Sequence, residues 1–155
     1  MAVPKKIINF LEKSKIRYKI LKHKKVFTAF DKSQTLKVSP NIVAKTLVLK
    51  IDKNLFFVLI PADKRLDFKK LKKLGKKISL LSEKLIKKKI KNTKMGAIPP
   101  FGNLWKIITI ADSSFKTKRK IILNSGDWKH SIEISPKSLK KLIPDLIWQK
   151  VSIKM

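Results

Sequence analysis

Runs of apolar residues mark the strands of this chain. The clearest pair is residues 43–51 and 55–60, separated by the polar turn 52–54 and ended by Pro61. Two apolar runs of this length around a short polar turn predict a β-hairpin. Shorter apolar runs predict further strands at residues 16–21, 78–81, 107–111, 120–123 and 131–134.

Apolar residues at helical spacing, each set preceded by a residue that favours a helix start, predict five helices. These helices begin at or just after Pro4, Thr28, Asp67, Ser82 and Ser135. We expect Gly75 to end the third helix. We also expect Leu85, Ile86 and Ile90 of the fourth helix to face the core. The sum is an α+β fold, a mixed and mostly antiparallel sheet flanked by helices, in a single domain over residues 1–155.

The net charge of +29 predicts a polyanionic partner, and RNA is the obvious one. The lysine content favours a second interpretation with nearly equal weight. Of 39 basic residues only Arg17, Arg65 and Arg119 are arginine, although surfaces that bind phosphate usually include arginine for bidentate contacts. Such a bias is typical of an AT-rich genome, so the charge supports an RNA partner without identifying it.

Several classes of function are excluded or disfavoured by composition. The chain has no cysteine, and its two histidines, His23 and His130, lie far apart in sequence, so we expect neither a disulfide nor a metal site nor a cofactor. The longest apolar run, residues 55–60, is too short for a membrane span. The apolar stretch after Pro4 is too short for a signal peptide. We therefore expect a cytoplasmic protein, and self-repulsion of its charge favours a monomer.

Most candidate nucleophiles and carboxylates have a structural explanation. His130 and Ser131 are adjacent on a predicted strand, so their side chains point to opposite faces and do not form a dyad. Asp67 is explained as a helix cap beside Asp63. Lys45 is harder to explain, because it interrupts the apolar strand 43–49. It is either a functional cation or a strand residue that faces solvent by alternation.

A second unusual feature is the loop Gly96-Ala97-Ile98-Pro99-Pro100-Phe101-Gly102. Its two prolines stiffen the backbone and its two glycines permit unusual dihedral angles. A stiff loop with free N–H and C=O groups is suited to holding a small ligand. The alternative is a plain connection between two elements.

In order along the chain, these segments resemble the YbaK family of trans-editing aminoacyl-tRNA deacylases, which is related to the editing domain inserted in bacterial prolyl-tRNA synthetases. The matching segments are His23 with Phe27-Thr28, residues 43–47 around Lys45, residues 58–63 with Leu66-Asp67, residues 95–102, Asp112, Asn124-Ser125-Gly126 and His130-Ser131-Ile132. Two segments depart from the family. Ser125 stands where alanine is usual, and residues 30–34 contain less Ala and Glu than expected.

The resemblance implies a freestanding hydrolase that cleaves the ester of mischarged tRNA, with small amino acids such as Ala, Ser or Cys and with tRNA-Pro as a candidate. The resemblance implies Lys45, Gly96 and Asn124 as catalytic residues. It implies substrate contacts at His23, Thr28, Ala97, Ile98, Pro99, Pro100, Gly126, His130 and Ser131. No metal or other cofactor is implied. The partners would be tRNA and an aminoacyl-tRNA synthetase.

Two other functions remain open on the sequence alone. The first is a non-catalytic module that binds aminoacyl-tRNA. The second is a general basic RNA-binding protein, which an apparent lack of exposed aromatic residues disfavours. Three tryptophans, Trp105, Trp128 and Trp148, are the exceptions to that pattern. Trp105 follows the loop and could stack on the terminal adenine, although core packing is the stronger expectation.

Overall fold

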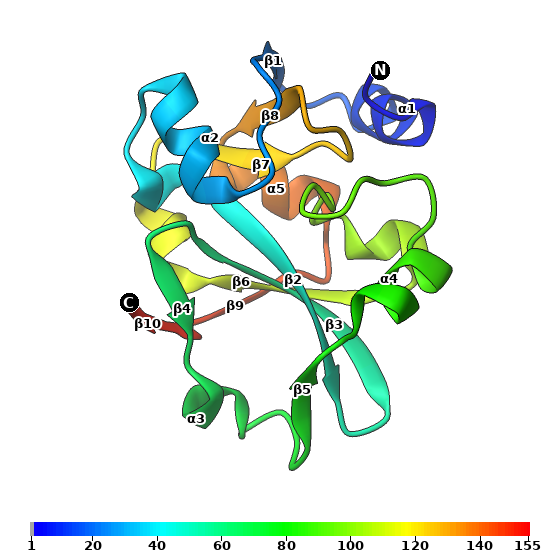
Figure 1. Cartoon of the computed structure of the whole chain (residues 1–155), viewed down its shortest axis with the longest axis vertical. Helices are drawn as coiled ribbons and strands as arrows, with labels where there is room; N and C mark the ends of the chain where they lie inside the picture. Colours follow the sequence, from blue (N-terminus) through cyan, green and yellow to red (C-terminus); the bar gives the residue numbers. More distant parts are fainter. Residues whose placement is uncertain (1) are drawn as a thin grey trace.

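The computed structural model describes residues 2–155, which form an α+β fold around a five-stranded sheet (Figure 1). The strands are β1 (Lys19–Lys22), β2 (Ala44–Ile51), β3 (Asn54–Pro61), β4 (Lys64–Leu66), β5 (Ile78–Leu80), β6 (Ile108–Asp112), β7 (Ile121–Asn124), β8 (His130–Ile134), β9 (Ile147–Gln149) and β10 (Ser152–Lys154). The helices are α1 (Lys5–Lys13), α2 (Ala29–Leu36), α3 (Phe68–Leu71), α4 (Glu83–Lys89) and α5 (Pro136–Leu142), with 3-10 helices η1 (Pro40–Ile42), η2 (Gly102–Trp105) and η3 (Ser113–Thr117).

Antiparallel pairing dominates, as predicted. In the five-stranded sheet, with order β5-β2-β3-β6-β9, β2 pairs antiparallel with β3 along its whole length and with β5. Only the β3–β6 and β6–β9 pairs are parallel. A three-stranded sheet, β1-β8-β7, and the pair β10–β4 are antiparallel. The predicted mixed, mostly antiparallel sheet flanked by helices is therefore confirmed.

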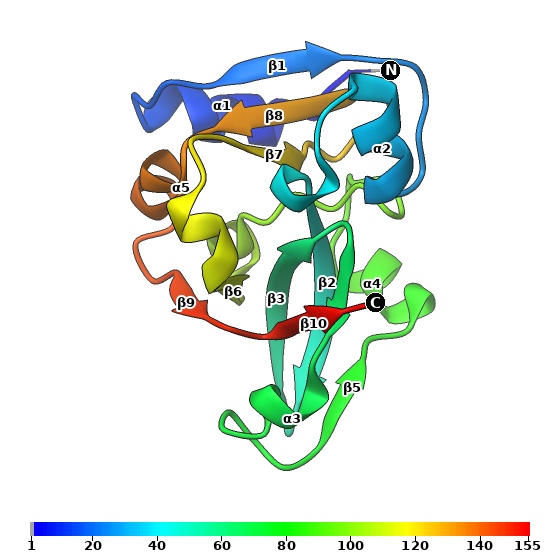
Figure 2. The ribbon, with the colours of Figure 1, turned by 90° about the vertical axis from the view of Figure 1, so that its left-hand side faces the viewer.

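The three-stranded sheet meets the larger sheet where β2 begins. An isolated parallel bridge joins Val43 to Ile122, and both side chains are buried. Side chains of α2, including Ala29 and Leu36, pack over this junction. Figure 2 shows α2 beside the three-stranded sheet, above the start of β2. Helix α2 and strands β2 and β7 are thereby brought together at one place.

The predicted helix starts are present. The side chains of Thr28, Ser82 and Ser135 accept hydrogen bonds from the backbone N–H groups of Asp31, Leu85 and Ser138, at 3.1–3.3 Å. Asp67 caps α3 in the same way. These local interactions satisfy N–H groups that have no partner within the helix, which explains why short sequence patterns located the helices.

One predicted helix end is wrong. Helix α3 ends at Leu71, so Gly75 is not its stop. A Cβ at Gly75 would lie 2.5 Å from Oδ2 of Asp52, and the Asp52 carboxylate accepts hydrogen bonds from the N–H groups of Lys76 and Lys77. Glycine is needed here because the backbone packs closely against the turn of the β2–β3 hairpin.

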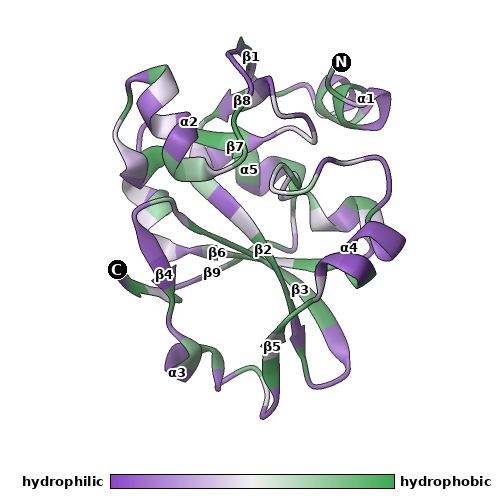
Figure 3. Ribbon diagram, viewed as in Figure 1, coloured by the Kyte–Doolittle hydropathy of each residue, from purple (hydrophilic) through white to green (hydrophobic). Residues whose placement is uncertain are grey.

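Two further expectations are corrected. Leu85 of α4 is 41% exposed rather than core-facing, while Ile90 is buried. Strands β4, β9 and β10 were not expected from the sequence. Figure 3 shows hydrophobic residues along β3 and hydrophilic residues over much of α4. None of the helices in residues 2–155 is long and apolar enough to cross a membrane.

Asp112 ties the C-terminal segment to the sheet. Its Oδ1 accepts hydrogen bonds from the N–H groups of Val151 and Ser152, at 2.9 and 3.1 Å, and its Oδ2 accepts from Ser114. The residue is 1% exposed. Burial alone would raise the pKa of this carboxyl, but the hydrogen bonds from Ser114, Val151 and Ser152 outweigh it and lower the pKa. The ionised form is therefore the one that the fold stabilises.

We expect Asp112→Asn to lower the free energy of unfolding at neutral pH by about 3 kcal/mol, because hydrogen bonds to a buried charge are each worth about 1.5–3 kcal/mol. The loss should shrink as the pH falls through the native pKa of Asp112, since protonation removes the same interaction from the wild type. Urea unfolding measures both effects. Asp145→Asn, at an exposed position, is the control. Equal losses in the two variants would contradict this role.

Candidate functional site

The proline-containing loop is held in place by its own backbone. The carbonyl of Ala97 accepts a hydrogen bond from the N–H of Gly126 at 2.7 Å, and the carbonyl of Ile98 accepts one from Nδ2 of Asn124 at 3.2 Å. The carbonyl of Pro100 accepts from the Thr109 hydroxyl at 2.8 Å. The expectation of free polar groups is therefore wrong for most of the loop, because these carbonyls already have partners.

The Gly96 end of the loop is different. Gly96 is exposed, whereas Ala97, Ile98, Pro99 and Pro100 are buried. Its φ of +81° is unfavourable for any residue with a side chain, and a Cβ there would lie 2.6 Å from the carbonyl oxygen of Phe27. The backbone at Gly96 is thus the part of the loop that a ligand can approach.

A cleft of about 510 Å³ opens beside Gly96. Met95, Gly96 and Ile98 line it from the loop, and Thr46, Leu47 and Val48 of β2 line it from the sheet. Side chains of Phe27 and Trp128 also border it. This volume lies in the range of small-molecule sites in proteins.

Lys45 flanks this cleft without lining it. By strand alternation Lys45 shares a face of β2 with Leu47, which lines the cleft, rather than with Thr46 and Val48. An isolated parallel bridge joins Val43 to Ile122, and Lys45 and Asn124 each follow it by two residues along their own strands. Lys45 is half-buried, and desolvation lowers the pKa of its ammonium, while the charge of Asp63 opposes that shift.

Lys32 is the site residue that the sequence did not predict. The residue is only 4% exposed, and its ammonium donates a 2.7 Å hydrogen bond to Oδ1 of Asn124. Burial lowers the pKa of Lys32 to about 8. No carboxylate of residues 2–155 forms an ion pair with it. One sequence feature could have revealed it, because Lys32 shares a helical face with Ala29 and Leu36, which pack on the core.

His23 and Ser131 are brought together although they lie far apart in sequence. Nε2 of His23 is 2.8 Å from the Ser131 hydroxyl, and Nδ1 is 2.8 Å from the carbonyl oxygen of Lys24. Since a carbonyl only accepts, Nδ1 carries the proton and Nε2 accepts from Ser131. Desolvation and the charge of Lys32 lower the pKa of His23, which favours this neutral form. Ser131 is 0% exposed, so no substrate can reach it as a nucleophile.

His130 has a separate partner, as its opposite orientation on the strand requires. Its Nδ1 lies 2.6 Å from Oδ2 of Asp127, which also accepts from the N–H of Lys129. Burial would raise the pKa of Asp127, but these hydrogen bonds outweigh it and lower the pKa. His130 therefore helps to shape the turn that holds Gly126 rather than completing a dyad with Ser131.

The structure therefore connects most of the residues predicted from the sequence. Hydrogen bonds or strand pairing link Asn124 to Ile98 and Ser131, Ser131 to His23, and Gly126 to Ala97. Gly96 packs against Phe27, and Lys45 lies on β2, which pairs with β3 and β5. The hydroxyl of Thr28 is used as the N-cap of α2. Among the described residues, no group of three His, Cys, Asp or Glu side chains could hold a metal ion.

Trp105 and Phe27 have different surroundings. Trp105 packs against Phe57, with ring centroids 5.8 Å apart, in the core as expected. Phe27, by contrast, is 55% exposed and meets Trp128 at 4.9 Å. The expected lack of exposed aromatic residues is therefore wrong at this position.

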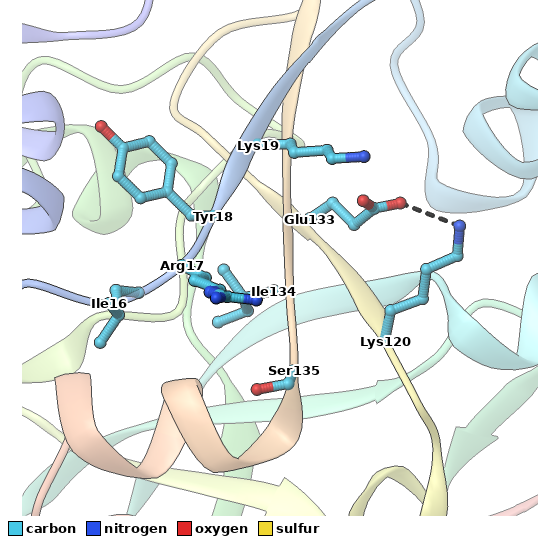
Figure 4. Close-up of a pocket in the computed structure, with 8 residues that line it drawn as sticks. All are labelled: Ile16, Arg17, Tyr18, Lys19, Lys120, Glu133, Ile134 and Ser135. Atoms are coloured by element: carbon cyan, nitrogen blue, oxygen red, sulfur yellow. Dashed lines mark ion pairs between the residues drawn. The ribbon is translucent and has the colours of Figure 1, made fainter.

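A separate hollow of about 430 Å³ lies at the far end of the β1–β8 pair (Figure 4). The register places Lys19 opposite Glu133 at this end and Lys22 opposite His130 at the other. Glu133 is paired with Lys120 at 3.0 Å. The hollow is lined by none of the site residues predicted from the sequence, so it is not the candidate functional site.

Known proteins resemble this chain in sequence and in fold. The model of the aminoacyl-tRNA editing domain family matches residues 23–142. Among curated proteins, the prolyl-tRNA editing protein ProX of Acetoanaerobium sticklandii is 28% identical over 145 residues, which cover 88% of each chain.

Two crystal structures share the fold. A hypothetical protein superposes with a TM-score of 0.87 at 22% identity, over 96% of this chain and 100% of that one. A candidate trans-editing enzyme for prolyl-tRNA synthetase superposes with a TM-score of 0.84 at 17% identity, over 98% of this chain and 99% of that one. The family match spans most of the chain and includes the loop, Lys45 and Asn124. The chain therefore belongs to the aminoacyl-tRNA editing domain family and is an aminoacyl-tRNA deacylase.

Proposed function

We propose that this deacylase removes a small amino acid, such as alanine, serine or cysteine, from mischarged tRNA, with tRNA-Pro as the first tRNA to test. The observation that carries the proposal is the cleft of about 510 Å³ between Gly96 and Thr46, with Lys45 at its flank. The resemblance of the chain to a curated prolyl-tRNA editing protein supports tRNA-Pro.

The ester of an aminoacyl-tRNA is already activated, so a strong nucleophile is not required. In the proposed reaction, water attacks the ester carbonyl carbon, the bond to the ribose oxygen breaks, and that oxygen takes the proton that the water loses. The neighbouring ribose hydroxyl relays this proton. Correct positioning can lower such a barrier by roughly 7–11 kcal/mol. One donor directed at the developing oxyanion adds roughly 3–4 kcal/mol.

Lys45 is the proposed electrostatic group. Its ammonium would bind the ester carbonyl or the terminal phosphate and fix the substrate at the flank of the cleft. Partial desolvation, which lowers its pKa, strengthens its interaction with an anion. Asp63 carries a buried carboxylate oxygen without a hydrogen-bond partner among the described residues, and its charge partly offsets the lowering of the Lys45 pKa by desolvation.

The remaining residues position the substrate or the loop. The exposed backbone at Gly96 would orient the water or the amino acid. Asn124 acts indirectly, because both ends of its amide are already bonded, to Lys32 and to Ile98. Gly126 supports the loop through the Ala97 carbonyl. In this proposal the chain works as a monomer in the cytoplasm, on tRNA that a synthetase has released.

Replacing Lys45 by alanine should lower kcat/KM for deacylation at least about 100-fold, because it removes the donor at the oxyanion or phosphate. Thermal unfolding should be unchanged, since Lys45 is only half-buried. The measurement uses tRNA charged with Ala, Ser or Cys. Lys50→Ala, an exposed lysine on the same strand, is the control and should retain wild-type turnover.

Two outcomes of this assay would reject parts of the proposal. If Lys45→Ala keeps the wild-type rate on every mischarged tRNA, Lys45 has no role in the reaction. If the wild type binds these tRNAs without turnover, the chain is a binding module instead.

Lys32 predicts a specific pH dependence of stability. Its native pKa of about 8 is below the ordinary lysine value of 10.5, so the unfolded chain binds more protons between these two pH values. Stability should therefore rise with pH across this window. We expect the wild type to gain about 2 kcal/mol relative to Lys32→Met between about pH 7 and pH 9.5.

Urea unfolding at several pH values measures this difference. The matched control is Lys84→Met, because Lys84 is an exposed lysine on α4. The free energy of unfolding of this control should differ from that of the wild type by the same amount at every pH. Parallel curves for Lys32→Met as well would show that Lys32 is not a buried cation.

A further inference from the structure

Phe27 and Trp128 form an aromatic pair on the surface. Their rings meet edge to face, with centroids 4.9 Å apart and an interplanar angle of 76°. Phe27 is 55% exposed, and Trp128 is half-buried. Neither side chain belongs to the four hydrophobic clusters that make up the described core. Core packing therefore does not explain why large aromatic residues occupy these positions.

Two lysines lie over the pair. Nζ of Lys25 is 4.9 Å from the ring centroid of Trp128 and 5.7 Å from that of Phe27. Nζ of Lys94 is 5.6 Å from the Trp128 ring. Lys25, Lys94, Asp127, Trp128 and Lys129 line a hollow of about 290 Å³ at this place. Asp127 is engaged by His130 and the Lys129 N–H, so the charge left for a ligand is positive.

The pair is fixed to the entrance of the cleft. Nε1 of Trp128 donates a 2.7 Å hydrogen bond to the carbonyl of Met95, the residue before Gly96. The Phe27 carbonyl lies against Gly96, where a Cβ would be 2.6 Å away. Phe27 and Trp128 also line the cleft itself. A ligand bound on the aromatic pair would therefore lie next to Gly96 at the entrance of the cleft.

We propose that Phe27, Trp128, Lys25 and Lys94 bind the unpaired 3′ end of an RNA, with bases stacked on the aromatic rings and phosphates paired with the lysines. The inference rests on the proposed function, because the aminoacyl ester sits at that end of the RNA and enters the cleft beyond the pair. Stacking on aromatic rings together with nearby cations is the usual chemistry for single-stranded nucleic acid. The lysines leave the ring faces and move to the phosphates when the RNA binds.

Binding of uncharged RNA tests the site without any need for catalysis. The probes are an RNA hairpin with an unpaired 3′ tail and the same hairpin with a blunt end, measured by fluorescence anisotropy. We expect the wild type to bind the tailed hairpin more tightly. Phe27→Ala should weaken that binding about tenfold, the effect of losing one stacked base. Phe68→Ala, which removes a phenylalanine of similar exposure (45%) on α3, should not.

The charge contribution has its own measurement. For Lys25→Gln with Lys94→Gln, the slope of log affinity against log salt should become shallower by roughly 0.7 for each phosphate that the variant no longer neutralises. The control is Lys72→Gln with Lys73→Gln, an exposed pair just after α3. A similar change in both double variants would mean that the effect is general charge, and it would overturn the assignment of Lys25 and Lys94.

Catalysis separates this inference from the proposed function. Equal binding of tailed and blunt hairpins, or equal losses in Phe27→Ala and Phe68→Ala, overturns the inference even if the wild type deacylates tRNA. Tail-dependent binding that Phe27→Ala reduces supports the inference even if no mischarged tRNA is turned over, in which case only the proposed function fails. Where turnover is seen, Phe27→Ala should raise KM more than it lowers kcat.

Discussion

The site depends on the two hydrogen bonds that the Asn124 side-chain amide makes. Its Oδ1 accepts from the ammonium of Lys32 on α2, and its Nδ2 donates to the carbonyl of Ile98 in the loop. One buried side chain therefore joins three segments that are distant in sequence. An ammonium buried without a carboxylate partner is costly, so this hydrogen bond is retained only if the surrounding packing holds α2, β7 and the loop together.

The two parts of the loop therefore have different roles. Because Asn124, Gly126 and Thr109 occupy the carbonyls of Ile98, Ala97 and Pro100, the buried part of the loop acts as a fixed support. The exposed backbone at Gly96 is left for the ligand. A preorganised support of this kind lowers a barrier without rearranging during the reaction. It suits an ester hydrolase in which water, rather than a side chain, is the nucleophile.

The features that the sequence predicted correctly are those set by local interactions. The β2–β3 hairpin and the caps at Thr28, Ser82 and Ser135 depend on neighbours within a few residues. The role of Lys32 depends on Asn124, 92 positions away, and the role of His23 on Ser131, 108 positions away. Neither pairing follows from spacing. Strands β4 and β10 were missed because neither lies in an apolar run, whereas the equally short β5 lies in the mostly apolar segment 78–81.

Lysine rather than arginine is the suitable cation beside the cleft. A bidentate arginine contact requires a phosphate held at a fixed orientation, and the flexible end of a single strand does not provide one. Point charges on flexible stems can follow such a strand, and in the proposed complex Phe27 and Trp128 supply the position that charge alone lacks. Lysines that lie over aromatic rings at the cleft therefore have a specific place in the proposed complex, whatever the origin of the lysine excess elsewhere on the surface.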